Sequence, residues 1–317
     1  MILTTTDTNN VAAITIAGAI AEAAAVLRQA GIAEARREAG SLLSHALARD
    51  RTFLLTHAHD ALSPDDLARF RAFVSRRAAG EPLQYISGRQ EFYGLDFEVT
   101  PAVLIPRPET ELLVETALEH LSTNGAPLVC DVGTGSGCVA VALLNERANA
   151  RSVAVDISPA ALDVAARNAE RHGVRARLAL LAADGLTALD PRGARFTVIL
   201  SNPPYIAEEE IDELQREVRD HEPRSALTPG GDGLAMIRRL LADAPRFLGA
   251  GGHLIFEIGF DQHERVAALI DTCVWKLLDI RQDLQGIPRT VVLRRVRRLN
   301  RNRRQRDKSL TAKTQRH

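Results

Sequence analysis

Residues 128–144 read LVCDVGTGSGCVAVALL, in which two apolar runs flank a glycine-rich segment. An apolar run ends at Asp131 and Val132, a glycine-rich turn follows, and a second apolar run begins at Cys138. This order is typical of a buried strand that turns tightly into a helix. Glycines let such a turn approach a ligand closely, and the first turn of the helix presents free N–H groups. The stretch therefore predicts a ligand-binding strand–turn–helix unit of an α/β protein.

The chain from residue 127 onward repeats this alternation of short apolar runs and helical segments. Continuous apolar strands joined by helices indicate a mostly parallel sheet that is covered on both faces. We therefore predict the α/β fold class for a large domain that spans residues 105–297. Its apolar runs are PLVCDVG, RSVAVDIS, ARLALLAAD, FTVILSN, GHLIFEIG, VWKLLDIRQD and RTVVLRRV.

The chain before this domain has a different pattern. Residues 15–83 carry apolar side chains at helical spacing and are predicted to form a small helical domain. Ser63-Pro64-Asp65-Asp66 is a helix start, in which Ser63 caps and Asp66 reaches back to the cap. The helix that follows is expected to run from Pro64 to about Ala79 and to end at Gly80. Residues 84–104, with aromatic and β-branched side chains around two glycines, are expected to form a hairpin linker.

The composition of the 317 residues is that of an ordinary globular protein, with 45% hydrophobic and 25% charged residues. Residues 11–27 are apolar, but Glu22 interrupts them and no basic segment precedes them, so we interpret them as an amphipathic helix rather than a signal peptide or membrane span. The three cysteines are scattered, which argues against a disulfide framework and favours a cytoplasmic protein. His57 and His59 have no carboxylate or cysteine set beside them, so no metal site is expected.

The net charge of zero hides an asymmetry. Residues 294–317 hold eleven Lys and Arg and one Asp, so residues 1–293 carry an excess of acidic residues. Residues 1–14 are expected to form an N-terminal extension, and residues 298–317 a basic disordered tail that can contact RNA or the ribosome. A solvated extension without a specific partner is the favoured interpretation of this tail. The acidic body is a poor match for duplex nucleic acid.

The glycine-rich turn has the spacing G-x-G-x-G, from Gly133 through Thr134, Gly135 and Ser136 to Gly137. Dinucleotide-binding proteins have G-x-G-x-x-G, and nucleotide phosphate loops add a Lys-Ser/Thr pair that is missing here. The turn is therefore not expected to bind a pyrophosphate.

Three acidic residues follow predicted strands at the edge where the turn lies. Asp156 stands 21 residues beyond Gly135, a place from which a carboxylate accepts hydrogen bonds from both ribose hydroxyls. Asp184 is placed to accept the adenine amino group, and Asp131 favours a cationic group. An adenosine with a positive centre describes S-adenosylmethionine, which we predict as the cofactor. A helix-capping role is the alternative for each acid alone.

The strand-end motif Asn202-Pro203-Pro204-Tyr205 predicts the reaction. The side-chain oxygen of Asn202 and the carbonyl of Pro203 can accept both hydrogens of a planar NH₂ group and turn its nitrogen toward an incoming methyl. The two prolines stiffen the turn, and Tyr205 offers a face for stacking. We therefore predict direct in-line methyl transfer to a planar NH₂ group, with Asn202, Pro203 and Tyr205 as catalytic residues.

Several further stretches make this sequence similar to the HemK/PrmC family of release factor glutamine-N5 methyltransferases, which are class I S-adenosylmethionine-dependent enzymes. The similarity extends over about residues 20–297. The stretches are EPLQYISG (81–88), FYG (92–94), IPRPETE (105–111), EPRSAL (222–227), GGDGL (230–234), FEIG (256–259) and DLQG (283–286).

The resemblance implies a seven-stranded, Rossmann-like methyltransferase domain, a helical substrate-recognition domain and a connecting β-hairpin. It implies that the substrate is the glutamine in the Gly-Gly-Gln motif of class-1 translation release factors. It further implies that Gly133–Gly137 and Asp156 bind the cofactor. Asn202 would contact both cofactor and glutamine, while Pro203, Pro204 and Tyr205 complete the substrate clamp.

The chain departs from the family after Asp184. Some relatives carry an aromatic residue there that packs on the adenine, whereas this chain has Gly185 and Leu186. Gly185 has no side chain to pack on the adenine, so this contact would then come from another residue, such as Leu186 or Ile157. Two other functions remain open, an amino-methyltransferase that acts on adenine or guanine in nucleic acid and a non-catalytic binding module.

Overall fold

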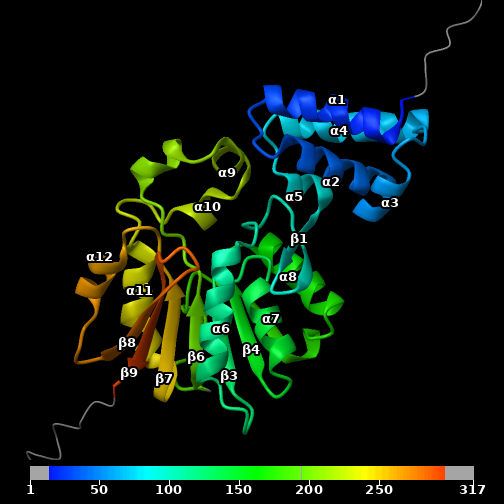
Figure 1. Cartoon of the computed structure of the whole chain (residues 1–317). Coiled ribbons are helices and arrows are strands. Elements are labelled where there is room, and N and C mark those ends of the chain that lie inside the picture. The colour runs from blue at the N-terminus through cyan, green and yellow to red at the C-terminus, as the bar shows by residue number, and fades with distance from the viewer. Residues whose placement is uncertain (1–13, 194, 297–317) are drawn as a thin grey trace, which may run out of the picture. The chain divides into compact units, whose positions relative to one another are not determined.

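The structure, a computed structural model, describes residues 14–193 and 195–296. The described chain divides into two compact units (Figure 1). One comprises the residues up to Gly88 together with Gln215–His221, and the other comprises Arg89–Leu214 and the residues from Glu222 onward. The segment 215–221 was not expected in the helical unit. The basic tail 298–317, and the predicted extension apart from residue 14, lie outside the described residues.

The helical unit is built around an apolar cluster in which Leu27, Leu42 and Leu43 are fully buried. Helices form here because apolar residues recur at helical spacing, and packing them together removes that stripe from water. None of the described helices of the chain is long and apolar enough to cross a membrane. The helices of this unit are α1 (Ile16–Gln29), α2 (Ala35–Leu47), α3 (Arg51–Thr56), α4 (Pro64–Ala78), α5 (Leu83–Ser87) and α9 (Arg216–His221).

The predicted start of α4 is confirmed. The Asp66 amide donates to the Ser63 hydroxyl over 3.1 Å, and that hydroxyl donates to the Asp66 carboxylate over 2.7 Å. Pro64 occupies the first turn, and the helix ends at Ala78, before Gly80 takes a left-handed φ of +105°. A cap of this kind contributes about 1 kcal/mol to helix stability.

Arg77 ties the segment 215–221 to the helical unit. Its guanidinium is nearly buried and makes ion pairs with Glu38 on α2 at 2.5 Å and with Glu217 on α9 at 2.7 Å. A buried guanidinium without partners is strongly unfavourable, and these two carboxylates compensate its positive charge. Glu217 lies far from Arg77 in the chain, which is why the sequence alone did not indicate the contact.

The second unit begins with a short hairpin of β1 (Arg89–Phe92) and β2 (Leu95–Glu98). The expected strand pair therefore starts at Arg89, because Leu83–Ser87 form α5 instead of a strand. Phe92 and Phe97 of the hairpin are buried in the core of this unit.

Within the described residues, the main sheet has seven strands in the order β5-β4-β3-β6-β7-β9-β8. The five strands from β5 to β7 are parallel, and β9 runs antiparallel to both β7 and β8. This confirms the predicted α/β class and the mostly parallel sheet. The strands are β3 (Leu128–Val132), β4 (Arg151–Asp156), β5 (Leu178–Ala182), β6 (Phe196–Ser201), β7 (Leu248–Glu257), β8 (Trp275–Gln282) and β9 (Pro288–Arg295).

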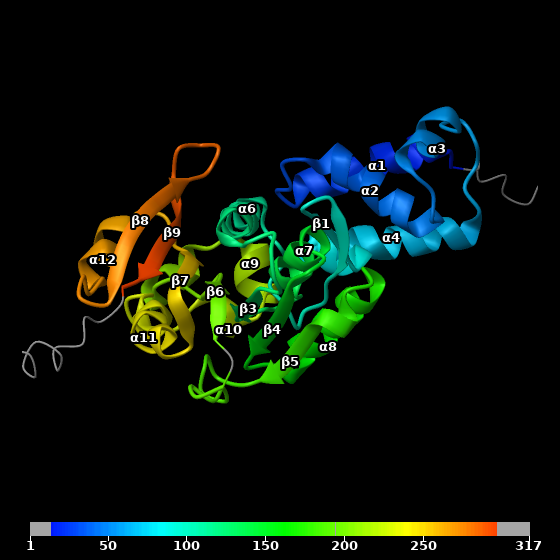
Figure 2. The same ribbon diagram turned by 90° about the horizontal axis from the view of Figure 1, so that it is seen from below.

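Helices cover both faces of this sheet. Figure 2 shows α6 and α7 on one face and α11 on the other, each over its own cluster of buried apolar side chains. The remaining elements of the unit are η1 (Pro108–Thr110), α6 (Glu111–His120), α7 (Cys138–Glu146), α8 (Pro159–Arg171), η2 (Arg175–Arg177), η3 (Glu208–Glu213), α10 (Arg224–Leu227), α11 (Ala235–Asp243), η4 (Ala244–Arg246) and α12 (His263–Leu269).

The order of the strands reverses between β3 and β6. The chain moves outward from β3 to β4 and β5, and then returns to place β6 on the other side of β3. In open α/β sheets, ligands bind outside the carboxyl ends of the strands at such a point. The glycine-rich turn follows β3 and Asn202 follows β6, so both predicted motifs lie at this edge.

A pair of histidines gives this unit a pH-dependent stability. The rings of His120 on α6 and His253 on β7 stack with centroids 4.3 Å apart. Burial, with help from the neighbouring His120 and Arg294, lowers the pKa of His253 from 6.5 to about 4. The unfolded chain therefore binds a proton more readily than the folded chain between these values, and stability falls as the pH drops through that window.

We expect His253→Phe to remove this contribution while keeping the ring contact. Each pKa unit corresponds to about 1.4 kcal/mol, and because His253 is only half-buried we discount the effect to about 1 kcal/mol between pH 7 and pH 5. Urea unfolding of both proteins at the two pH values measures it. An equal loss of stability in the variant and the parent would contradict the assignment.

Candidate active site

The glycine-rich turn after β3 needs its glycines for conformation and for packing. Gly133, Gly135 and Gly137 have φ values of +75°, +54° and +80°, a region that other residues rarely adopt. A Cβ atom on Gly137 would also lie 3.0 Å from the Cβ of Ala165 on α8, whereas one on Gly135 would meet no atom within 4 Å. The amides of Gly133 and Thr134 donate to the Val155 carbonyl, which fixes the turn against β4.

Two of the predicted acids hold this turn from either side. The Asp131 carboxylate is buried and accepts a hydrogen bond from the Thr134 hydroxyl over 2.7 Å. Burial, with a smaller contribution from the nearby charge of Asp156, raises the pKa of Asp131 to about 6. The Asp156 carboxylate accepts one bond from the Gly135 amide at 2.8 Å and one from the Ser158 amide at 2.9 Å.

These groups fit S-adenosylmethionine. Each Asp156 oxygen accepts one backbone N–H and has a further lone pair, so the oriented carboxylate can accept two ribose hydroxyls. A buried carboxyl with a raised pKa, such as Asp131, is stabilised in its ionised form by a positive ligand group. Ser136 is buried within the turn, and its carbonyl accepts a bond from Asn168 on α8 over 2.9 Å.

Asp184 lies two residues beyond β5, and Arg239 on α11 donates to its carboxylate over 2.8 Å and to its carbonyl over 3.2 Å. Gly185 has a φ of +61°, and a Cβ there would lie 3.3 Å from the Arg239 guanidinium. The two residues expected to replace the adenine contact, Leu186 and Ile157, differ in exposure. Leu186 is buried in the core, whereas Ile157 is 62% exposed. The structure thus places Arg239, which sequence reasoning missed, beside the predicted adenine residues.

The Asn202–Tyr205 segment lies directly beside the glycine-rich turn. The Ser201 hydroxyl donates to the Val132 carbonyl over 2.7 Å, and a Cβ on Gly133 would lie 3.9 Å from the Asn202 carbonyl oxygen. Pro203 is buried, while Asn202, Pro204 and Tyr205 are partly exposed. The motifs predicted from separate parts of the sequence therefore meet at one edge of the sheet.

Two polar side chains from distant parts of the chain contact this segment. The Asn202 side-chain amide donates to the Thr110 hydroxyl over 2.9 Å, and the Tyr205 hydroxyl donates to the Glu257 carboxylate over 3.2 Å. No role was expected for Thr110 or Glu257 from the sequence. The available signal was that both stand in stretches that carry the family resemblance, IPRPETE and FEIG.

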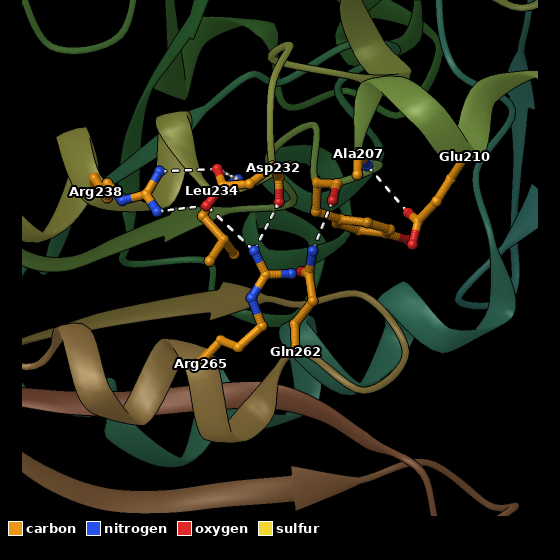
Figure 3. A network of polar contacts seen from close by, with 8 residues as sticks. Ala207, Glu210, Asp232, Leu234, Arg238, Gln262 and Arg265 are labelled. Atoms are coloured by element: carbon orange, nitrogen blue, oxygen red, sulfur yellow. Dashed lines mark hydrogen bonds and ion pairs between the residues drawn. The ribbon is translucent and has the colours of Figure 1, made fainter.

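The backbone of Tyr205 is held as well. The Gln262 side chain donates to the Tyr205 carbonyl over 2.7 Å and accepts from the Gly259 amide over 2.9 Å. Figure 3 shows Gln262 beside Arg265, whose guanidinium reaches Asp232, and shows Glu210 turned back to the amide of Ala207. These contacts fix the segment from both sides before any substrate arrives.

Among the described residues, neither a metal cluster nor an activated thiol adjoins these motifs. In the part of the chain that the structure describes, no group of three or more His, Cys, Asp or Glu side chains is arranged to hold a metal ion. Cys138 opens α7, but burial raises the pKa of its thiol to about 12, which is the opposite of an activated nucleophile.

Comparison with known proteins agrees with this geometry. Residues 18–88 match the model of the PrmC N-terminal domain, and residues 109–238 match the methyltransferase small domain. The seven-stranded sheet, the site at its carboxyl edge and these matches define a class I methyltransferase that uses S-adenosylmethionine.

Three relatives are similar over most of their length, and each is named a release factor glutamine methyltransferase. The relative from Nitratidesulfovibrio vulgaris is 44% identical over 89% of this chain and 95% of its own. The relative from Burkholderia pseudomallei is 48% identical over 80% of this chain and 89% of its own. The relative from Cereibacter sphaeroides is 46% identical over 88% of this chain and 98% of its own. The chain belongs to the release factor glutamine methyltransferase family.

Proposed function

We propose that this protein transfers the methyl group of S-adenosylmethionine to the side-chain amide nitrogen of the glutamine in the Gly-Gly-Gln motif of class-1 translation release factors. The observation that carries the proposal is the Asn202–Tyr205 segment, which lies against the glycine-rich turn with its amide and hydroxyl groups already oriented. Family membership supports the choice of a glutamine in a release factor as the substrate.

The cofactor-binding residues in this proposal surround the turn after β3. Asp131, Gly133–Gly137 and Asp156 hold the ribose and the positive part of the ligand, and Asp184 and Gly185 adjoin its adenine. The substrate-binding residues are Asn202, Pro203, Pro204 and Tyr205, of which Asn202 adjoins both ligands.

In this mechanism the protein acts by positioning. S-adenosylmethionine supplies a methyl group on a sulfonium, which is a good leaving group. Asn202 and the Pro203 carbonyl each accept one hydrogen of the glutamine NH₂ and turn the nitrogen toward the methyl carbon. The new C–N bond forms as the C–S bond breaks, and the nitrogen then releases one proton to the solvent. No residue of the chain has to remove that proton first.

The remaining parts of the chain take supporting roles in the proposal. The helical domain, residues 15–83, recognises the release factor, and residues 84–104 link it to the methyltransferase domain 105–297. A release factor substrate implies a cytoplasmic location. The basic tail is a candidate for contact with RNA or the ribosome.

Mass spectrometry of a release factor incubated with the protein and S-adenosylmethionine tests the proposal. We expect one added methyl group on the Gly-Gly-Gln peptide, and none on a release factor whose Gln in this motif is replaced by Ala. A parallel incubation with DNA and RNA and labelled cofactor is expected to give no labelled nucleic acid. Label in the nucleic acid, with an unmodified release factor, would instead favour an adenine or guanine amino-methyltransferase.

A further inference from the structure

A continuous chain of polar side chains lies behind the amide of Asn202. The Asn202 Nδ2 donates to the Thr110 Oγ1 over 2.9 Å, and the Thr110 Oγ1 donates to the Glu257 Oε2 over 2.7 Å. The Tyr205 hydroxyl donates to the other oxygen, Oε1, over 3.2 Å. Thr110 and Glu257 are 2% and 1% exposed, so water has little access to their contact. Three separate segments meet here: the end of η1, the end of β7 and the turn after β6.

The chemistry of these groups fixes which partner donates and which accepts in each hydrogen bond of this row of side chains. An ionised carboxylate can only accept hydrogen bonds, so the single proton of the Thr110 hydroxyl points at Glu257. That hydroxyl can then only accept from Asn202, which must present its NH₂ end. The Oδ1 of Asn202 is consequently turned to the other side of the amide. An amide that had no such neighbour could present either end.

We propose that Thr110 and Glu257 are positioning residues which fix the orientation of the Asn202 side-chain amide, so that its Oδ1, and not its NH₂, faces the amide group to be methylated. This inference rests on the proposed function, because the orientation matters only if an NH₂ group is the acceptor. A reversed Asn202 would place NH donors against the NH donors of the substrate.

The charge state of Glu257 controls the donor–acceptor order of the hydrogen bonds from Asn202 through Thr110 to Glu257. Burial raises the pKa of Glu257, and the hydrogen bonds from Thr110 and Tyr205 and the charge of Arg289 partly offset this rise, which leaves the pKa at about 7. The charge of Glu109 also contributes to this raised pKa, and Arg289 is itself paired with Asp283 at 3.1 Å. The pKa of Tyr205 is raised by burial and by Glu257, so its hydroxyl stays protonated.

Protonation of Glu257 removes the constraint. A carboxylic acid can donate as well as accept, so the Thr110 hydroxyl is free to point its proton at Asn202. The amide then rotates to offer its Oδ1 to Thr110 and its NH₂ to the substrate. Turnover should therefore be near its maximum at pH 8 and fall as the pH drops through about 7.

The first test compares Thr110→Val with Thr110→Ser. Valine has nearly the same shape and no hydroxyl, whereas serine keeps the hydroxyl. We expect the valine variant to lower kcat by about 10- to 100-fold, because an oriented contact to the reacting group is released, and the serine variant to stay within about threefold of the parent. The Kd for S-adenosylmethionine should stay within about threefold in both, since the cofactor contacts lie elsewhere.

The second test is the pH dependence of kcat in the parent protein and in Glu257→Gln. The kcat of the parent should fall about tenfold between pH 8 and pH 6, because the ionised fraction of Glu257, with its pKa of about 7, falls about tenfold over this range. The glutamine variant should have a low kcat at every pH and should not show this loss between pH 8 and pH 6. A neutral amide can donate as well as accept, so it does not fix the donor–acceptor order of the hydrogen bonds. Asp131, with a pKa of about 6, also titrates in this range, and the pH dependence of the cofactor Kd reports it separately.

Several outcomes would overturn the inference. Equal kcat values for the valine and serine variants would do so, as would an unchanged acid limb in Glu257→Gln. If a variant does not fold, as thermal unfolding would reveal, the parent protein still decides, because a kcat that is flat from pH 6 to pH 8 contradicts the role of Glu257. A failure of the proposed function looks different, since the parent would then produce no methylated glutamine at any pH.

Discussion

Asn202→Ala should lower kcat for methylation of the release factor by about a thousandfold, the size of loss that follows removal of a pre-oriented polar group from a reacting centre. Alanine cannot accept a hydrogen from the substrate NH₂, so the nitrogen is no longer turned toward the methyl carbon. The side chain is held by Thr110 before substrate binds, which means that its ordering costs nothing during the reaction. Single-turnover kinetics with saturating release factor measures the effect.

The same variant should bind the cofactor almost normally. Apart from Asn202 itself, the residues assigned to S-adenosylmethionine are those of the turn after β3 together with Asp156, Asp184 and Gly185, and the substitution leaves all of these in place. Calorimetry should give a Kd within about threefold of the parent. Asn124→Ala makes the same chemical change at an exposed position and should leave both quantities unchanged. A kcat for Asn202→Ala within tenfold of the parent would remove Asn202 from the mechanism.

Local signals explain how much of this site could be predicted from the sequence. The glycine-rich turn and the Asn202 motif each occupy a few adjacent residues, and the residue types in each indicate the group that it binds. Their meeting follows from fold class, because carboxyl ends of parallel strands share one edge of a sheet and the strand order reverses beside β3. The parallel strands themselves were indicated by continuous apolar runs.

The contacts behind Asn202 could not be predicted in this way. Thr110 and Glu257 are 147 residues apart, and the stretches that hold them, IPRPETE and FEIG, indicated the family but not a contact between these two side chains. Their contact depends on η1 and the end of β7 reaching the same place, which only the folded chain decides. The same reason hides the pairing of Arg77 with Glu217.

The helix α5 shows a local competition between signals. Gln84-Tyr85-Ile86-Ser87 contains an aromatic and a β-branched residue, which favour a strand. The structure has a helix there, with Pro82 at its N-cap and Gly88 in the left-handed conformation at its C-cap. Tyr85 and Ile86 are both buried, and end signals together with burial outweigh the strand preference of the two residues.

Gly233→Ala should be the most damaging change in the loop that supports Tyr205. A Cβ on Gly233 would lie 2.3 Å from the Tyr205 carbonyl oxygen and 3.0 Å from the Ala207 nitrogen, both of them backbone atoms. The loop cannot easily move away, because the Glu208 amide donates to the Gly231 carbonyl over 2.9 Å and Asp232 is paired with Arg238 and Arg265. The Tyr205 segment must therefore shift, and the shift passes through the prolines to Asn202.

Gly230→Ala is the matched control for this prediction. Gly230 and Gly233 have φ values of +81° and +78°, so alanine is equally strained at both, by about 1 kcal/mol. A Cβ on Gly230 meets no atom within 4 Å. We expect kcat to fall about a hundredfold in Gly233→Ala, because a displacement of about 1 Å in a positioning group has that effect, and to stay within about threefold in Gly230→Ala. Equal losses in the two variants would mean that backbone strain, and not the collision with Tyr205, limits the site.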